Sequence, residues 1–172
     1  GVQVSPIPTA ILSTHTGGFG DVVMRDLTDY LAPCLEHYKS QGIEFECVYS
    51  GFLASENQVD HCLEFFRSYP EAFKVVDPVM GDHGKPYKTY TKAMQKRMAE
   101  LVRVADLITP NVTEACILLG EEYDHNPITR QQAKSMLVRL SEMGPRYVVI
   151  TGMQLASGTM TNVGYDRERN AF

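Results

Sequence analysis

The stretch Leu107-Ile108-Thr109-Pro110-Asn111-Val112-Thr113-Glu114 decides the fold, because it holds the end of a strand, a turn and the start of a helix. The apolar pair at its beginning indicates a short strand, which Pro110 stops. Asn111 with Glu114 three residues later is typical of a helix N-cap, and Gly120 predicts the end of that helix. A strand that passes through a tight turn into a helix is the repeating unit of α/β proteins.

The same alternation of strand and helix extends along most of the chain. Apolar residues that alternate or run together predict strands at 43–50, 73–76, 107–109 and 147–151. Apolar residues at helical spacing predict helices from Ser55 to Pro70, around Met94 to Val102, from Asn111 to Gly120 and from Thr129 to Gly144. This order predicts an α/β domain with a mostly parallel sheet flanked by helices.

Two helix starts carry an additional local signal. Ser55 with Gln58, and Thr129 with Gln132, both resemble capping boxes, in which each side chain bonds the backbone of the other residue. The segment 81–90 between a predicted strand and a predicted helix is expected to be a loop.

The two ends of the chain are less regular. Residues 31–40 are expected to form a helix with Pro33 in its first turn, and residues 160–172 a hairpin with its turn at 164–167. Residues 17–29 are expected to be irregular. The glycine-rich Gly17-Gly18-Phe19-Gly20 lacks the Lys-Ser/Thr of a Walker motif, so we interpret it as a connector and not as a phosphate loop.

Composition excludes several classes of function. The 172 residues carry a formal net charge of −5, which argues against a nucleic-acid-binding surface. Apolar runs are far shorter than a membrane span requires, so no membrane partner is expected. The four cysteines lie far apart, without a Cys-x-x-Cys pair, and the N-terminus lacks a signal-peptide pattern. We therefore expect a cytoplasmic protein.

Polar residues follow three of the predicted strands. The carboxyl ends of parallel strands share one edge of a sheet, where ligands of such folds bind. Asp77 and Asp82, separated by a turn with Gly81, could together hold a hydrated Mg²⁺ there, because hard oxygen ligands suit that ion. Alternatively the two carboxylates make only turn hydrogen bonds. A second acidic motif at the same edge favours the metal.

That second motif is Asn111 with Glu114, which also has two interpretations. The pair can cap its helix, or Glu114 can face a metal-bound water or a phosphate beside the positive end of the helix. Both roles are compatible with one segment. Zinc binding by Cys34 with His37, or by His61 with Cys62, is disfavoured because no matched pair completes a set of four ligands.

Taken together, these residues resemble the pyridoxal/pyridoxamine kinases of the ribokinase-like (PfkB) superfamily. The resemblance covers nearly the whole chain and is strongest over 48–120. The motifs that carry it are Ser13-Thr14-His15-Thr16, Ser50-Gly51-Phe52-Leu53, the stretch from Asp77 to Tyr87, Ala105-Asp106-Leu107-Ile108-Thr109-Pro110-Asn111 with Glu114, and Val148-Val149-Ile150-Thr151.

The resemblance implies ATP-dependent phosphorylation of the hydroxymethyl group of a B6 vitamer (pyridoxal, pyridoxamine or pyridoxine), as in salvage of pyridoxal phosphate. It implies Mg²⁺ as cofactor, a monovalent cation as a further candidate, and a homodimer. The implied substrate contacts are His15, Thr16 and Phe52. The implied ATP contacts are Asp77, Tyr87, Thr109, Glu114 and Thr151, and the implied metal ligands are Asp77, Asp82 and Glu114. Some relatives have tyrosine in place of Phe52, and a serine or lysine in place of Gly152.

One family element is absent from the sequence. Relatives carry a later glycine-rich turn that ends in the aspartate acting as general base, and no Gly-x-Gly-Asp occurs here. We therefore assign no catalytic residue within 1–172 and expect the general-base aspartate downstream of Phe172. Asp166 is not assigned as the base, because it lies in the predicted hairpin turn.

The same absence bears on the domain. We expect residues 1–172 to be part of a single ribokinase-like kinase domain, without its first strand and its C-terminal catalytic and ATP-binding portion. Such a part is expected to be inactive alone.

Three other functions are compatible with parts of the pattern. A hydroxymethylpyrimidine or hydroxymethylpyrimidine-phosphate kinase would share the fold and a flat heteroaromatic alcohol as substrate. A non-catalytic vitamer- or nucleotide-binding module would explain the missing aspartate. A nicotinamide-dependent dehydrogenase ranks last, because the dinucleotide fingerprint is missing.

Overall fold

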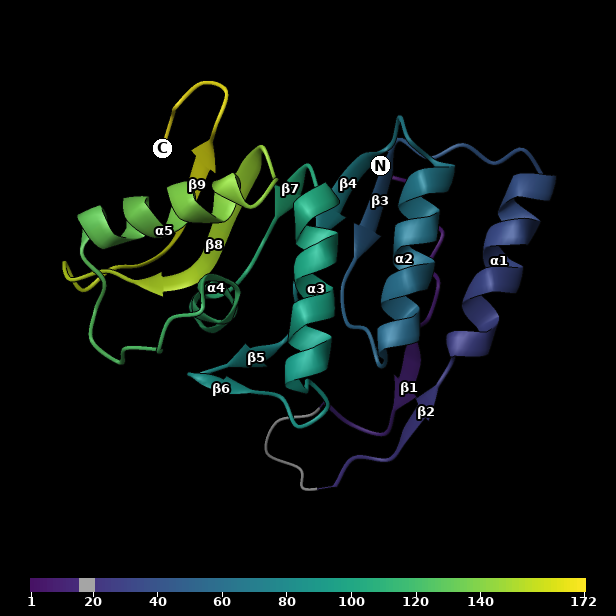
Figure 1. The fold of residues 1–172 in the computed structure, drawn as a ribbon, viewed down its shortest axis with the longest axis horizontal. Helices are drawn as coiled ribbons and strands as arrows, with labels where there is room; N and C mark the ends of the chain where they lie inside the picture. The colour runs from purple at the N-terminus through teal and green to yellow at the C-terminus, as the bar shows by residue number, and fades with distance from the viewer. Residues whose placement is uncertain (16–20) are drawn as a thin grey trace.

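The computed structural model describes residues 1–15 and 21–172, and its centre is a five-stranded sheet (Figure 1). The strands are β3 (Cys47–Ser50), β4 (Phe73–Val76), β7 (Leu107–Ile108), β8 (Tyr147–Gln154) and β9 (Met160–Asp166), in that spatial order. The first four run parallel, and β9 is antiparallel to β8. The predicted α/β class and mostly parallel sheet are confirmed.

Helices connect the parallel strands. Helix α2 (Glu56–Ser68) joins β3 to β4, α3 (Lys92–Val104) joins β4 to β7, and α4 (Val112–Leu119) with α5 (Arg130–Glu142) joins β7 to β8. Helix α1 (Thr28–Ser40) precedes β3. Since the parallel strands follow one another in spatial order and such crossovers are right-handed, the connecting helices lie on one face of the sheet. No helix among the described residues is long and apolar enough to cross a membrane.

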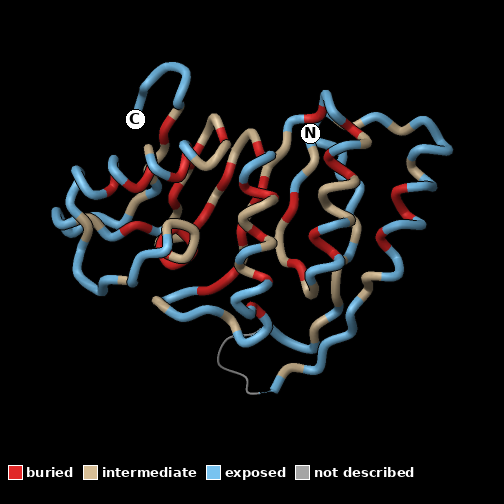
Figure 2. Tube along the Cα trace, viewed as in Figure 1, coloured by how far each residue is buried: buried red, intermediate tan, exposed pale blue. Residues whose placement is uncertain are grey.

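The main core lies between this face of the sheet and the helices. Val76, Ile108 and Val148 point into it from three neighbouring strands and are fully buried, as are Met98 and Leu101 on α3. In Figure 2 the buried segments run along the central strands and the inner sides of the helices. The core therefore holds the strand ends, and the loops that follow them, at fixed positions.

Two short antiparallel ribbons lie outside the central sheet. The first pairs β1 (Ala10–Leu12) with β2 (Met24–Asp26), and β2 lies within residues 17–29, which the sequence pattern predicts to be irregular. The second pairs β5 (Gly81–Asp82) with β6 (Lys85–Pro86), so the expected loop at 81–90 contains a hairpin. All four strands have two or three residues, which is too short to show an alternating pattern in the sequence. The Gly17–Gly20 connector lies outside the described residues.

Several boundaries differ from the sequence expectation. Strand β3 begins at Cys47 and not at residue 43, and α1 begins at Thr28, which places Pro33 in the second turn and not the first. Strand β9 runs through residues 160–166 as the partner of β8, so the predicted turn at 164–167 is wrong. The chain turns later, where Asp166 accepts hydrogen bonds from the backbone N–H groups of Glu168 and Arg169.

The two predicted capping boxes have different outcomes. Thr129 and Gln132 form theirs at the start of α5. Ser55 is the N-cap of α2, but its side chain accepts no cap hydrogen bond. Gln58 instead turns its side chain toward Ala54 N–H and the carbonyl of Thr9. The predicted box is wrong there because Gln58 is fully buried and takes tertiary partners.

The hairpin β5–β6 depends on a glycine. A Cβ at Gly81 would lie 2.4 Å from the carbonyl oxygen of Lys85 and 2.8 Å from Cα of Pro86, whereas a Cβ at Gly120, which has a φ of +70°, would meet nothing within 4 Å. We expect Gly81→Ala to lower the free energy of unfolding by about 3 kcal/mol, because backbone must move. The matched Gly120→Ala should cost about 1 kcal/mol, from its left-handed conformation alone.

Urea unfolding of both variants followed by circular dichroism measures the two losses. If both variants lose the same free energy of unfolding, the hairpin accommodates a Cβ at Gly81 without strain.

Candidate active site

The carboxyl ends of three neighbouring parallel strands meet at one rim. Backbone hydrogen bonds fix their register: Asp77 N–H donates to Ser50 O at 2.8 Å, Thr109 N–H to Val76 O at 3.1 Å, and Thr151 N–H to Pro110 O at 2.9 Å. Asp77 and Thr109 each follow directly on the last residue of a strand, and Thr151 lies within β8 beside the start of α4. The structure thus brings these three predicted site residues to one edge of the sheet.

Glu114 joins the first helical turn of α4 to the loop after β4. One of its carboxylate oxygens accepts the N–H of Asn111 at 2.8 Å, which completes a capping box, and the other accepts the N–H of Met80 at 3.0 Å. The Asn111 amide in turn donates to the carbonyl of Gly81 at 2.8 Å. Because Met80 is three residues beyond Asp77, Asp77 and Glu114 lie on the same rim.

The rim is negatively charged and partly desolvated. Burial raises the pKa of Glu114 from 4.5 to about 7, and the nearby Asp77 charge adds to the rise. Burial also raises the pKa of Asp77, which the hydrogen bond from Tyr49 Oη at 2.9 Å partly offsets. Among the described residues no ion pair reaches Asp77 or Glu114. A cation from outside the chain would relieve this charge.

Asp82 lies farther out, on the hairpin. Its side chain is half exposed, accepts the backbone N–H of His83 at 2.8 Å and lies 3.5 Å from the His83 imidazole. Such turn bonding is the alternative that the sequence leaves open. Burial raises the pKa of Tyr87, and the charges of Asp82, Glu114 and Asp77 add to the rise, so the three carboxylates lie within electrostatic reach of its hydroxyl.

The three carboxylates do not form a closed metal cage. Within residues 1–15 and 21–172 no three His, Cys, Asp or Glu side chains come close enough together to hold a metal ion. All four cysteines are free thiols. Mg²⁺ in enzymes that bind nucleotides usually takes one or two carboxylates, several waters and substrate phosphates, so Asp77 and Glu114 fit that ion without a cage.

The predicted ring-binding residue Phe52 lies in an irregular segment after β3. The Thr9 hydroxyl donates to the carbonyl of Phe52 at 2.7 Å, and the ring of Tyr90 meets the ring of Phe52 edge to face, with 6.2 Å between centroids. Sequence reasoning identified neither Thr9 nor Tyr90, because both act over long sequence separations. His15 follows β1, and Thr16 lies outside the described residues.

Phe172, beyond which the general base is expected, packs away from the rim. Its ring stacks on the ring of Tyr165 in β9, with 4.7 Å between centroids, and the Lys134 Nζ of α5 lies 4.3 Å from the centroid of the Phe172 ring. Both partners belong to the far end of the sheet and its covering helix, and the contacts described for Phe172 include no rim residue. Phe172 therefore has a packing role, and a general base downstream of it stays a prediction.

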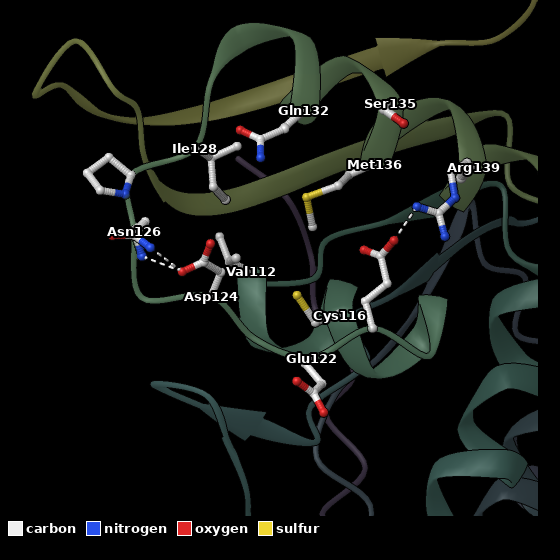
Figure 3. Close-up of a pocket in the computed structure, with 12 residues that line it drawn as sticks. Val112, Cys116, Glu122, Asp124, Asn126, Ile128, Gln132, Ser135, Met136 and Arg139 are labelled. Atoms are coloured by element: carbon white, nitrogen blue, oxygen red, sulfur yellow. Dashed lines mark hydrogen bonds and ion pairs between the residues drawn. The ribbon is translucent and has the colours of Figure 1, made fainter.

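A separate pocket of about 280 Å³ lies between α4, α5 and the loop that joins them (Figure 3). Cys116 and Met136 line its apolar side, and Arg139 pairs with Glu121 at its edge. None of the predicted site residues that the structure describes lines this pocket. It is therefore not part of the rim.

The raised pKa of Glu114 gives a pH dependence. Since the folded-state pKa lies above the ordinary value, the protonated carboxyl stabilises the fold below pH 4.5, and this contribution is lost as the pH rises through about 7. Between pH 4.5 and 8 we expect wild type to lose about 2–3 kcal/mol of stability relative to Glu114→Gln, which does not titrate.

Chemical unfolding of both proteins across this pH range gives the difference. If the difference in stability between the two proteins does not change with pH, the raised pKa is contradicted. Such a constant difference would report only the altered hydrogen bonds to Met80 and Asn111.

Comparison with known proteins agrees with the fold. A crystal structure of a protein from Bacteroides thetaiotaomicron, assigned as a phosphomethylpyrimidine kinase and crystallised with pyridoxal, has 35% sequence identity and a TM-score of 0.91, covering 99% of this chain and 60% of that one. The thiamine biosynthetic bifunctional enzyme of Arabidopsis thaliana is 32% identical over 90% of this chain and 29% of its own length. A pyridoxal kinase of Deinococcus radiodurans is 25% identical over 95% of this chain and 57% of its own.

The chain thus spans less than two thirds of the length of these relatives. The ribokinase-like fold and the resemblance to pyridoxal kinases are confirmed by these matches. The family model for phosphomethylpyrimidine kinases matches residues 5–171. The chain therefore belongs to the phosphomethylpyrimidine kinase family.

Proposed function

We propose that the protein containing this chain transfers the γ-phosphoryl group of ATP to the hydroxymethyl group of a B6 vitamer. The observation that carries the proposal is the pair Asp77 and Glu114, held on one rim without a cationic partner among the described residues. Membership of a kinase family and likeness to a protein crystallised with pyridoxal support the reaction and the substrate class.

Catalysis of phosphoryl transfer depends mainly on positioning and on neutralising phosphate charge. Asp77 and Glu114 would hold Mg²⁺ through water or directly, and Asp82, farther out on the hairpin, would act on the ion only through water. The metal, when bound, draws negative charge away from the β- and γ-phosphates. Thr109, Thr151 and Tyr87 would contact the nucleotide from the same rim. A monovalent cation would bind beside the same carboxylates and balance the negative charge that Mg²⁺ leaves.

The vitamer would lie on the other side of the rim. Phe52 would pack against the pyridine ring, while His15 and Thr16 would supply polar contacts to its substituents. An aromatic ring recognises a flat heterocycle through its face, which explains why phenylalanine suffices where some relatives have tyrosine. The proposal assigns no residue among 1–172 as general base for the substrate alcohol and places that aspartate downstream of Phe172.

A pyrimidine substrate is the second candidate. The family description and the Arabidopsis thaliana thiamine enzyme favour hydroxymethylpyrimidine or its phosphate. The B6 vitamer is preferred because the similar protein crystallised with pyridoxal matches 99% of this chain. Both substrates present a hydroxymethyl group on a flat ring, so the rim chemistry is common to the two.

The domain, assembly and compartment are further parts of the proposal. We propose a single ribokinase-like domain to which residues 1–172 contribute, a homodimer as assembly and the cytoplasm as location. Free cysteines without disulfides accord with a reducing compartment. Light scattering of the purified full-length protein tests the dimer.

An ADP-release assay on the complete gene product decides the substrate. We expect turnover with pyridoxal, pyridoxamine or pyridoxine to exceed turnover with hydroxymethylpyrimidine by at least about 10-fold in kcat/KM, because a built ring site discriminates substituents by more than about 1 kcal/mol. Preference for the pyrimidine would replace the proposed substrate. Binding without ADP release would favour the non-catalytic module.

Substitution of Asp77 tests the charge argument. We expect Asp77→Asn to lower kcat/KM for MgATP on the order of 100-fold, because the neutral amide no longer compensates the metal charge in a partly desolvated site. Asp124→Asn is the control, since that carboxylate lies in the α4–α5 loop and bonds only to Asn126 in the contacts described. Unchanged MgATP kinetics in Asp77→Asn would remove Asp77 from the site.

A further inference from the structure

The segment 51–54, called here the Phe52 loop, has no regular secondary structure, yet side chains from distant segments hold its backbone. The Thr9 hydroxyl donates to Phe52 O at 2.7 Å. The Tyr90 hydroxyl accepts from Leu53 N at 3.2 Å and donates to Leu53 O at 2.9 Å. Gln58 accepts from Ala54 N at 2.8 Å.

Tyr90 makes the most constrained of these contacts. Its phenol group uses its one donor and one acceptor site on the two backbone groups of a single residue. Both Tyr90 and Leu53 are almost fully buried, with exposed fractions of 3% and 1%, so water cannot replace either bond. Burial raises the pKa of Tyr90, which keeps the donor proton in place at physiological pH.

Tyr90 also belongs to the segment that leads back to the rim. Its N–H donates to Tyr87 O at 2.9 Å, and the N–H of Tyr87 donates to Met80 O at 2.9 Å. Met80 is the residue whose N–H Glu114 accepts. A continuous set of hydrogen bonds therefore runs from the carboxylate rim to the Phe52 loop, and the Tyr90 ring contacts the Phe52 ring at its end.

We propose that Tyr90 is a positioning residue that fixes the Phe52 ring relative to the carboxylate rim and thereby sets the affinity for the heteroaromatic substrate. Thr9 restrains the same loop from the side of the β1–β2 ribbon. This inference rests on the proposed function in one respect, which is that Phe52 contacts the ring of the substrate. It assigns to Tyr90 no contact with substrate, metal or nucleotide.

Three variants of the complete enzyme test this role. Tyr90→Phe keeps the ring and removes both bonds to Leu53, and Thr9→Val removes the bond to Phe52 O from a different segment. Tyr165→Phe is the matched control, because Tyr165 is also a buried tyrosine whose hydroxyl bonds within the chain, to Asn170 at 3.0 Å on the distant strand β9. Each variant is measured for its melting temperature, its kcat, its KM for pyridoxal and MgATP, and its pyridoxal Kd by absorbance titration without ATP.

We expect Thr9→Val to raise KM and Kd for pyridoxal about 5-fold to 10-fold, the equivalent of one lost hydrogen bond in a loop, and Tyr90→Phe, which loses two, to raise them at least as much. Their KM for MgATP should stay within about 2-fold of wild type, whereas Tyr165→Phe should change only the melting temperature. Unchanged pyridoxal Kd in both loop variants, or equal changes for pyridoxal and MgATP, would overturn the inference. If Tyr90→Phe does not fold, Thr9→Val alone decides.

The wild-type measurement separates this inference from the proposed function. If wild type binds hydroxymethylpyrimidine and not pyridoxal, only the proposed substrate fails, and the same variants are compared with the pyrimidine. If wild type binds neither ring, both the proposed function and the positioning role of Tyr90 are wrong.

Discussion

The two backbone hydrogen bonds accepted by the Glu114 carboxylate are the contact on which the rest of the candidate site depends. One closes the N-terminus of α4, and the other holds the loop after β4 at Met80. Two further contacts support this one, because the Asn111 amide donates to Gly81 O and the Thr113 hydroxyl accepts from Gly84 N–H. Side chains at the start of α4 therefore set the position of the loop after β4, and Glu114 does so across 34 residues of sequence.

Sequence patterns that span only a few residues were sufficient to predict much of this fold. The caps at Asn111 and Thr129 could be predicted because donor and acceptor lie three residues apart in the sequence. The same pattern at Ser55 and Gln58 was wrong, since burial gave Gln58 better partners in Thr9 and Ala54 than the cap offered. Tertiary context overrides a local preference where the side chain is buried.

The sequence predicted where the candidate site lies, but not which distant side chains hold its residues in place. Parallel strands bring Asp77, Thr109 and Thr151 to one edge whatever the details of packing, so their convergence follows from the strand pattern. Tyr49 and Tyr90 act on partners 28 and 37 residues away, and no spacing rule connects such pairs. The turn predicted at 164–167 failed for a related reason, because pairing with β8 carries Gly164 through as a strand residue.

The cap and ligand roles of Glu114 are compatible because of the number of lone pairs on a carboxylate. Its two oxygens offer about four acceptor sites, and the N–H groups of Asn111 and Met80 occupy one on each oxygen. The backbone of Gly81 also hydrogen-bonds the carboxylate, and at least one site remains for metal-bound water, which is how Mg²⁺ usually meets protein carboxylates. A bound cation would also lower the pKa that burial has raised to about 7. The same backbone contacts that stabilise the helix start thus hold the carboxylate ready for a charge that the described residues do not supply.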